Sequence, residues 1–344
     1  MSERAGFLTA GTFCLDRNIT VDTWPEEDMV TTVRAVEHAG GGSACNFAVD
    51  MRKLDASVPV ETQTLVGADA DGDFLVSVAA AHGIGTEGFR RTDAAHTQTT
   101  DAYHSASTGR RTHILFEGTA TLMSPEHFDF STTSARFLHL GLPGIHKKMD
   151  GPWEGDPNGW VSVLKRAHSA GLETNLELVS TSADHLRETI LPCLPHLTTL
   201  VCNDFEIGAL ASAETVAGGV TDVAAVTSAA QQVLGAGAME LVAVHFTAGA
   251  VLVAREGETV FAPSVRVPAQ EHHGANGAGD AFAAGFFYGR HMGWAFDRCL
   301  RMGHATSAAS LRAPGTYEAV ESAKAVLALA ERWGWRDQSE NGSD

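Results

Sequence analysis

The feature that most constrains the fold is a regular alternation of short apolar runs and longer amphipathic stretches in the second half of the chain. From residue 136 onward, strand-like runs occupy residues 136–142, 173–179 and 196–203, and a stretch with helical periodicity follows each of them. Parallel strands need a crossover, and a helix is the usual crossover. The rhythm therefore predicts a three-layer α/β fold, a mostly parallel sheet with helices on both faces.

The first half and the end of the chain continue this pattern. Strands are expected within residues 6–24 and 58–67, and a hairpin is expected to start at residue 239. The second strand of that hairpin is expected at 250–256 and its turn at 257–260. Helices are expected directly after Gly42 and at 68–84, 159–171, 182–191, 204–211, 280–292, 295–311 and 317–333.

Residues 97–122 differ, because polar and apolar residues alternate on both sides of a turn at 107–111. This alternation predicts a hairpin with one face in water. We therefore expect an α/β core and a small β lid, and the lid comprises residues 17–40 and 97–120. The core comprises residues 1–16, 41–96 and 121–333, and residues 334–344 form a polar tail.

The charge of the chain narrows its range of partners. The 24 lysines and arginines face 42 aspartates and glutamates, which gives a formal net charge of −18. Such a field repels nucleic acid phosphates and anionic membranes, so we expect neither as a partner. A phosphate ligand must instead be held by backbone N–H groups, a few arginines and a metal ion.

Targeting signals and cysteines indicate a cytoplasmic protein. No apolar run approaches the roughly 18 residues that a membrane span needs. The first residues lack a basic segment followed by an apolar signal core. The five cysteines lie far apart without a C-x-x-C pair, which favours reduced thiols over disulfides or structural zinc.

The stretch NGAGD, at residues 276–280, lies between an extended segment and an apolar helical run. Free N–H groups at a helix start bind anions, and Gly277 and Gly279 let the backbone approach the anion closely. A carboxylate there would repel phosphate, but a phosphoryl transferase needs one to take the proton from the attacking hydroxyl. Asp280 is therefore a candidate general base; from this stretch alone, simple helix capping by Asp280 is an equal alternative.

A second glycine-rich entry to a helix occupies residues 38–48. Asn46 lies in the first turn, where its amide can point toward a ligand, and Gly41 and Gly42 leave backbone donors open to a polyol. Asp16, at the end of the first strand, is a candidate acceptor for sugar hydroxyls. The alternatives are a tight loop with a buried amide and an ordinary turn aspartate.

Asn203 and Glu206 follow another strand, at the sheet edge where open α/β sheets carry ligands. An amide and a carboxylate three residues apart suit the water shell of Mg²⁺, which keeps most of its waters. We expect Glu206 to act on the metal through water. A capping box at the helix start is an equally natural alternative.

Together these motifs resemble the ribokinase-like (PfkB) family of small-molecule kinases, over nearly the whole chain and in the family's order. Residues 11–16 are similar to its first strand and substrate aspartate, and residues 41–46 to its "GG…N" sugar motif. Residues 66–72 resemble its VG-x-D-x-x-G segment, and residues 109–122 its lid hairpin. Several ordered motifs at family spacing are far more specific than any one of them.

The resemblance implies a role for each matching residue. The amides of Gly277, Ala278 and Gly279 would form the anion hole, and Asp280 would be the catalytic base. Arg110 and Arg111, in the lid hairpin, are candidates to hold an anionic group. The implied substrate contacts are Asp16, Gly41, Gly42 and Asn46. The implied contacts to ATP and Mg²⁺ are Asn203, Glu206, Thr247, Gly249 and Asn276.

A few positions depart from the family's pattern. Gly274 and Ala275 replace the Asp-Thr that usually precedes the signature, and in many members that aspartate helps to organise a monovalent-cation site. Potassium activation is therefore in doubt. Thr247 replaces the first glycine of a Gly-x-x-Gly near the nucleotide, and Glu177 stands where an aspartate is common. These changes leave the base and the anion hole in place.

We therefore expect an ATP- and Mg²⁺-dependent kinase that phosphorylates a hydroxyl of a small molecule, namely a sugar, sugar acid or related polyol. The alternatives are a nucleoside or vitamin kinase of the same fold and a catalytically silent sugar-binding regulatory protein. An exposed apolar lid edge would allow two lids to pair, so a homodimer through the lid is an option.

Overall fold

A parallel sheet with the strand order β5-β4-β1-β8-β9 forms the centre of the molecule, whose computed structural model describes residues 4–337. Its strands are β1 (Phe7–Gly11), β4 (Val60–Gly67), β5 (Gly85–Thr92), β8 (Phe137–Gly141) and β9 (Glu173–Leu176). All neighbouring pairs run parallel. β1 and β8 are buried at every residue, as expected for strands with helices on both faces.

A second sheet, with the order β10-β13-β14-β15, continues the first one at β9. Its strands are β10 (Thr199–Asn203), β13 (Leu241–Phe246), β14 (Gly249–Ala254) and β15 (Thr259–Pro263). β10 and β13 are parallel, and the two remaining pairs are antiparallel. At the junction, the backbone N–H of Val201 donates to Asn175 Oδ1 at 3.1 Å. The predicted α/β fold with a mostly parallel sheet is confirmed.

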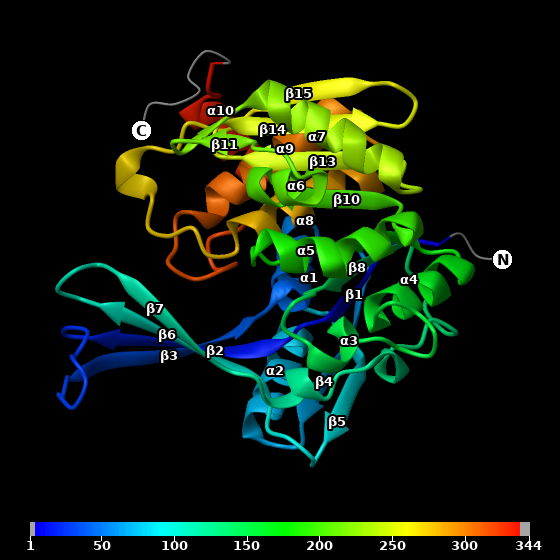
Figure 1. The fold of residues 1–344 in the computed structure, drawn as a ribbon. Helices are drawn as coiled ribbons and strands as arrows, with labels where there is room; N and C mark the ends of the chain where they lie inside the picture. The colour runs from blue at the N-terminus through cyan, green and yellow to red at the C-terminus, as the bar shows by residue number, and fades with distance from the viewer. Residues whose placement is uncertain (1–3, 338–344) are drawn as a thin grey trace.

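Helices cover both faces of this sheet (Figure 1). One face carries α1 (Ser43–Leu54), α2 (Ala70–Ala81), α8 (Ala278–His291), α9 (Phe296–Ser310) and α10 (Ala323–Trp333). The other face carries α3 (Lys147–Asp150), α4 (Gly159–Ser169), α5 (Ala183–Ile190), α6 (Asp204–Ala211) and α7 (Val223–Ala236). Alternation along β1 connects both layers, since Phe7 packs into the first and Leu8 into the second.

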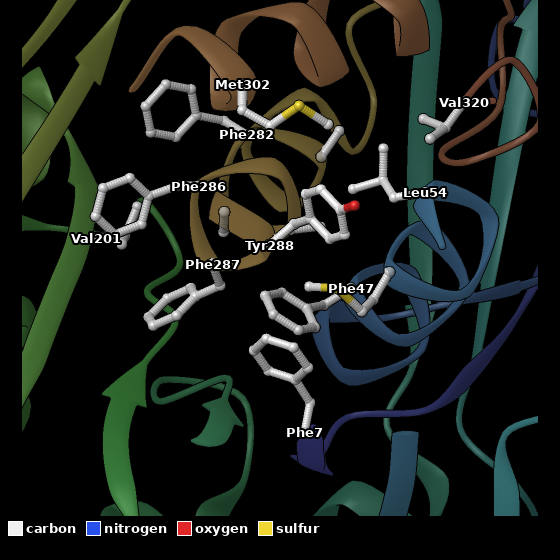
Figure 2. Close-up of a cluster of buried hydrophobic side chains, with 14 of the residues drawn as sticks. Phe7, Phe47, Leu54, Val201, Phe282, Phe286, Phe287, Tyr288, Met302 and Val320 are labelled. Atoms are coloured by element: carbon white, nitrogen blue, oxygen red, sulfur yellow. The ribbon is translucent and has the colours of Figure 1, made fainter. Parts of the chain in front are cut away.

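An aromatic cluster joins α1 and α8 to the sheet (Figure 2). The Phe47 ring centroid lies 5.6 Å from that of Phe7 and 6.0 Å from that of Phe287, both edge-on, and 4.0 Å from the stacked ring of His139. Phe47 is fully buried. Because Asn46 precedes Phe47 in α1, this packing fixes the N-terminal part of α1 against β1, β8 and the third turn of α8.

The lid sheet consists of β2, β3, β6 and β7, in the order β3-β2-β6-β7. These strands are β2 (Cys14–Val21), β3 (Val33–Gly41), β6 (Thr99–Ser105) and β7 (Arg111–Phe116). It projects to one side of the core (Figure 1). The predicted hairpin at 97–122 is confirmed as β6–β7. The expectation of a single wet face is wrong for β7, an edge strand exposed from residue 112 to 116.

The structure corrects several other expectations. The turn of the β13–β14 hairpin is at 247–248, and residues 257–260 instead lead into β15, a strand that the sequence analysis did not assign. α7 and β5 were not assigned either. The last helix begins at Ala323 because the side chain of Ser322 caps it.

The remaining elements are short. A two-residue ladder joins β11 (Val216–Ala217) to β12 (Val220–Thr221), and 3₁₀ turns lie at Gly118–Thr121, Pro125–His127, Leu191–His196 and Ala269–Glu271. Of the predicted polar tail, residues 338–344 lie outside the described residues, and Trp335 bridges to Val265. Within residues 4–337, no helix has the length and apolar character to cross a membrane.

Candidate active site

Helix α8 begins at the predicted glycine-rich turn without any side-chain cap. Gly277 occupies the cap position with φ +69°, a conformation that favours glycine. A Cβ there would lie 2.8 Å from the carbonyl oxygen of Thr316, so this turn packs tightly against the loop after α9. The first amides of a helix lack intrahelical partners, and their partial positive charge makes the start of α8 an anion site.

Asp280 lies in the first turn of α8, but it does not cap the helix, so the capping alternative is wrong. Its Oδ2 accepts a hydrogen bond from Asn46 Nδ2 at 2.9 Å. Burial raises the pKa of Asp280 to about 6, and the bond from Asn46 partly opposes that rise. The structure thus brings the Asn46 side chain of α1 to the start of α8, where Asp280 lies beside the uncapped amides.

Asp16 lies on β2, at the base of the lid sheet. A Cβ on Gly41 would lie 2.1 Å from Asp16 Oδ2, so the glycine makes room for this carboxyl group. Burial raises the pKa of Asp16 to about 6, and the charges of Glu318 and Asp280 contribute to that rise. Gly42, with φ +86°, is the cap residue of α1. The predicted substrate residues therefore converge on one region.

A pocket lies between the lid sheet and the loops on either side of the helix pair α8–α9. The lid contributes Asp16, Asn18, Ala39, Thr100, Ala102 and His113, and the core contributes Asn276, Gly315, Thr316 and Glu318. The six lid residues share one face of the sheet, because ladder partners point the same way. Asn276, expected near the nucleotide, thus lines the same pocket as Asp16.

The two lid arginines do not line this pocket. Arg110 is exposed in the β6–β7 turn. Arg111 Nη1 donates to the carbonyl oxygen of Pro314 at 2.8 Å, so it ties the lid to the loop after α9.

Asn203 and Glu206 form the capping box of α6. The Asn203 side chain accepts from the Glu206 amide at 2.8 Å, and Glu206 Oε2 accepts from the Asn203 amide at 2.9 Å. Glu206 is buried, which raises its pKa, and Ser180 Oγ donates to its Oε1 at 3.0 Å. The structure thus contains the capping box that was the alternative, and the buried carboxylate of Glu206 lies at the edge of the sheet.

Glu177 adds a second carboxylate at this edge. Burial raises its pKa strongly, with contributions from the charges of Asp280 and Glu206. Its Oε2 is buried and finds no hydrogen-bond partner within residues 4–337. In that same range, no group of three or more histidine, cysteine or acidic side chains is arranged to hold a metal directly. These oxygens therefore suit a hydrated Mg²⁺ rather than a bare protein cage.

The two residues of the β13–β14 hairpin that were expected near the nucleotide, Thr247 and Gly249, differ in their exposure. Thr247 is exposed in the β13–β14 turn, whereas Gly249 is buried, and a Cβ on it would lie 2.7 Å from the carbonyl oxygen of Ala262. Gly249 is thus needed for strand packing. The sequence analysis missed His245, whose Cε1 would lie 3.7 Å from a Cβ on Gly279. Burial lowers the pKa of His245 to about 4, which keeps the imidazole neutral.

Sequence reasoning also missed Glu318, Thr316 and His113. His113 could have been found, because alternation along β7 puts it on the same face as the pocket. Glu318 and Thr316 carried no such signal, since they lie in an irregular loop before α10.

The match with known proteins agrees with this geometry. The family model described as pfkB family carbohydrate kinase matches residues 8–323. No curated protein matches the chain.

Solved structures of kinases share the fold. The chain is similar to 2-dehydro-3-deoxygluconokinase from Thermotoga maritima, with 17% identity and a TM-score of 0.77 over 95% of this chain and 99% of that one. Ribokinase from Arabidopsis thaliana, solved with ribose and ATP, shows 19% identity and a TM-score of 0.74, with the same coverage. Nucleoside kinase from Methanocaldococcus jannaschii shows 17% identity and a TM-score of 0.73, over 96% of this chain and 100% of that one. With the family match extending over nearly the whole sequence, the chain belongs to the pfkB family of carbohydrate kinases.

Proposed function

We propose that this kinase transfers the γ-phosphoryl group of ATP to a hydroxyl of a sugar, sugar acid or related polyol. The hydrogen bond from Asn46 Nδ2 to Asp280 Oδ2 carries the proposal, because it holds a carboxylate beside the uncapped start of α8. A proton acceptor and an anion site then meet at one point, as phosphoryl transfer to an alcohol requires.

Each group of residues has a distinct task. Asp280 takes the proton from the attacking hydroxyl, and the amides of Gly277, Ala278 and Gly279 stabilise negative charge on the transferred group. The other hydroxyls of the acceptor are held by Asp16, Gly41, Gly42 and Asn46. Arg110 and Arg111 remain candidates for an anionic group; the bond from Arg111 to Pro314 supports a role in closing the lid.

ATP with Mg²⁺ supplies the phosphoryl group and neutralises its charge. The carboxylates of Glu206 and Glu177 would hold the metal through its waters. Glu177 Oε2, which lies 3.7 Å from His139 Nε2, supports this assignment because it has no hydrogen-bond partner within residues 4–337. Asn203 would orient Glu206 through the capping box. Thr247 and Asn276 are the remaining candidates for contacts to the nucleotide, whereas Gly249 would act only by letting β14 pack against β15.

Potassium is not expected to activate the enzyme. A Cβ on Gly274 would lie 3.1 Å from Pro314 Cα and 3.2 Å from the carbonyl oxygen of Ala313. An aspartate at this position would therefore require the loop after α9 to shift slightly. Gly274 itself offers no side-chain oxygen to a monovalent cation.

We also infer that two copies pair through their lids. Register places Val36, Ile114 and Phe116 on the face of the lid sheet opposite the pocket, and each is about half exposed. Burying such an apolar face is favourable, and edge strands that are left uncovered invite pairing. Changing Val36 and Ile114 to serine should convert a dimer to a monomer in light scattering.

A cytoplasmic location fits this function, because ATP is available there. All five cysteines are buried and free, in agreement with the expectation of reduced thiols.

The test is a coupled ADP-release screen over sugars, sugar acids, polyols and nucleosides, with and without potassium. Asp280→Asn should lower kcat by about 10²- to 10⁴-fold, because the general base is lost. Its circular dichroism spectrum should match that of the wild type. Asp297→Asn is the matched control, since Asp297 is an exposed aspartate in the first turn of α9.

Three other outcomes would contradict the proposal. Phosphorylation of adenosine in preference to sugars would point to a nucleoside kinase, for which the fold of the M. jannaschii protein is a precedent. Sugar binding without ADP release from any acceptor would point to a silent regulatory protein. Normal turnover by Asp280→Asn would remove Asp280 from the mechanism.

A further inference from the structure

The pocket between the lid sheet and the loops around α8 and α9 is lined by two carboxyl groups, and within residues 4–337 His113 is the one basic side chain in its lining. Asp16 lines it from the lid and Glu318 from the opposite loop. Of the residues described, no lysine or arginine lines it. The charge of Glu318 contributes to the raised pKa of Asp16, which indicates that the two carboxyl groups interact. Outside the pocket, the charge of Glu318 also acts on Lys53.

Four basic side chains from the lid sheet, α1 and the loop after α9 bind groups outside the pocket. Arg17 Nε lies 2.5 Å from Asp101 Oδ1, and register places both residues on the opposite face of the lid sheet. Arg111 donates to the carbonyl oxygen of Pro314. Arg312 Nη2 lies 2.6 Å from Glu321 Oε2. Lys53 Nζ donates to the backbone carbonyl oxygens of Tyr317 and Glu318, at 2.6 and 2.8 Å.

The position of Glu318 is built into the loop. A Cβ on Gly315 would lie 2.1 Å from Glu318 Oε2, so the carboxylate folds back over this glycine. The Tyr317 amide donates to Glu318 Oε2 at 3.2 Å. Tyr317 is anchored in turn, because its hydroxyl accepts from the Gly40 amide at 3.1 Å.

Unpartnered polar atoms nearby also match a particular kind of ligand. Asn46 is 4% exposed, and its Oδ1, beside Asp280, has no hydrogen-bond partner within residues 4–337. Thr316 lines the pocket, and its buried Oγ1 is likewise unpartnered in that range. The carboxylate oxygens and Asn46 Oδ1 only accept hydrogen bonds, whereas the Thr316 hydroxyl can accept or donate, so the acceptors at this site favour a ligand rich in O–H donors. A carboxylate or phosphate on the ligand would add hydrogen-bond acceptors and negative charge beside the carboxyl groups of the pocket, and such a ligand is therefore disfavoured.

We propose, on the basis of the proposed function, that the acceptor is a polyol without an anionic group and that Glu318 is the specificity-determining residue that excludes sugar acids and sugar phosphates. A like charge a few ångströms away in a partly desolvated site lowers affinity by about tenfold to a hundredfold. Specificity of this kind depends on a repulsive element as much as on attractive contacts. The likeness to a kinase named for a sugar acid is one of fold, and the acceptor depends on the pocket.

The test compares kcat/KM for two sets of probes in the ADP-release assay. The uncharged set is ribose, fructose, glucose and sorbitol; the anionic set is gluconate, 2-dehydro-3-deoxygluconate and fructose 1-phosphate. The best uncharged acceptor should exceed every anionic one by about tenfold or more. Glu318→Gln should raise kcat/KM for the anionic probes about tenfold, through KM, and change the uncharged ones less than about threefold.

Glu321→Gln is the matched control, because Glu321 lies three residues further on and is paired with Arg312. It should leave the ratio between the two sets unchanged. An anionic probe that is the best acceptor of the wild type, or a ratio unaffected by Glu318→Gln, would overturn the inference while the proposed kinase activity stands.

Absence of ADP release from every probe would instead contradict the proposed function. Calorimetric binding of the same probes then decides the inference separately. Binding of an uncharged probe at least about tenfold tighter than that of gluconate would support it. Equal or tighter binding of gluconate, or binding of no uncharged probe, would overturn it.

Discussion

The core sheet and the lid sheet differ in how much of their surface they bury. β1 and β8 are buried at every residue, whereas residues 33–38 of β3 and 112–116 of β7 are exposed. Most of the exposed large hydrophobic side chains of the described region lie in the lid, namely Trp24, Met29, Val30, Val33, Val36, Ile114, Leu115 and Phe116. The core therefore contributes most of the free energy of folding, whereas the lid leaves much of its apolar surface exposed to solvent.

The candidate active site draws on both regions. Asp280 comes from the core and Asp16 from the lid sheet, and the pocket lies where the two meet. Changes in the core should therefore alter stability, whereas changes in the lid should alter acceptor binding with little effect on folding.

The largest expected effect is on stability. Phe47→Ala should lower the free energy of unfolding by about 3–5 kcal/mol, because it empties a fully buried site between α1 and α8. Phe116→Ala, in the half-exposed lid, should change it by no more than about 0.5 kcal/mol. Urea unfolding measures both, and equal losses would abolish the distinction between core and lid.

The next effect is on binding. Asp16→Asn should lower kcat/KM for the acceptor by about 10- to 100-fold, mainly through KM, because a charged hydrogen-bond acceptor is lost. The melting temperature should not fall, since burial already disfavours the charged carboxylate. Asp101→Asn, on the opposite face of the same sheet, is the control and should leave KM unchanged.

The third effect is on pH dependence. Because the pKa of Asp280 is about 6 and the base must be charged, kcat/KM should fall about tenfold per pH unit below pH 6. Stability should change in the opposite sense. An unfolded aspartate has a pKa of about 3.9, so between pH 4 and 6 the native state binds more protons and becomes less stable as pH rises.

Urea unfolding of Asp280→Asn tests the sign of this second relation. The variant lacks the charge, so its stability should decline less between pH 4.5 and 7.5 than that of the wild type. A steeper decline in the variant would mean that the carboxylate is stabilised, rather than strained, by its surroundings.

The smallest effect concerns the contact between lid and core. Arg111→Ala removes the hydrogen bond to Pro314 and should raise the acceptor KM by about threefold with kcat nearly unchanged. Arg17→Ala is the matched control, because Arg17 lies on the opposite face of the lid sheet, where it pairs with Asp101. An equal change in both variants would indicate a general effect of charge instead of lid closure.

Much of the site could be predicted because its motifs are local. The glycines at 277 and 279 and the aspartate that follows form one turn, and Asn46 and Gly42 form another. The exposure of β7 could not be predicted in this way, because its position at the edge of the lid sheet is set by tertiary structure. The start of α10 did carry a local signal, the capping Ser322, which the expected helix at 317–333 overran.

The amino-acid sequence by itself determined the layered α/β fold and the shape of the phosphate-binding turn, because strand and helix periodicity and the φ of Gly277 are properties of short segments. Only the tertiary structure decided that Asn46 bonds to Asp280, 234 residues away, and that Glu318 faces Asp16. Such contacts depend on how whole helices and loops pack, and no short segment of the chain encodes that packing.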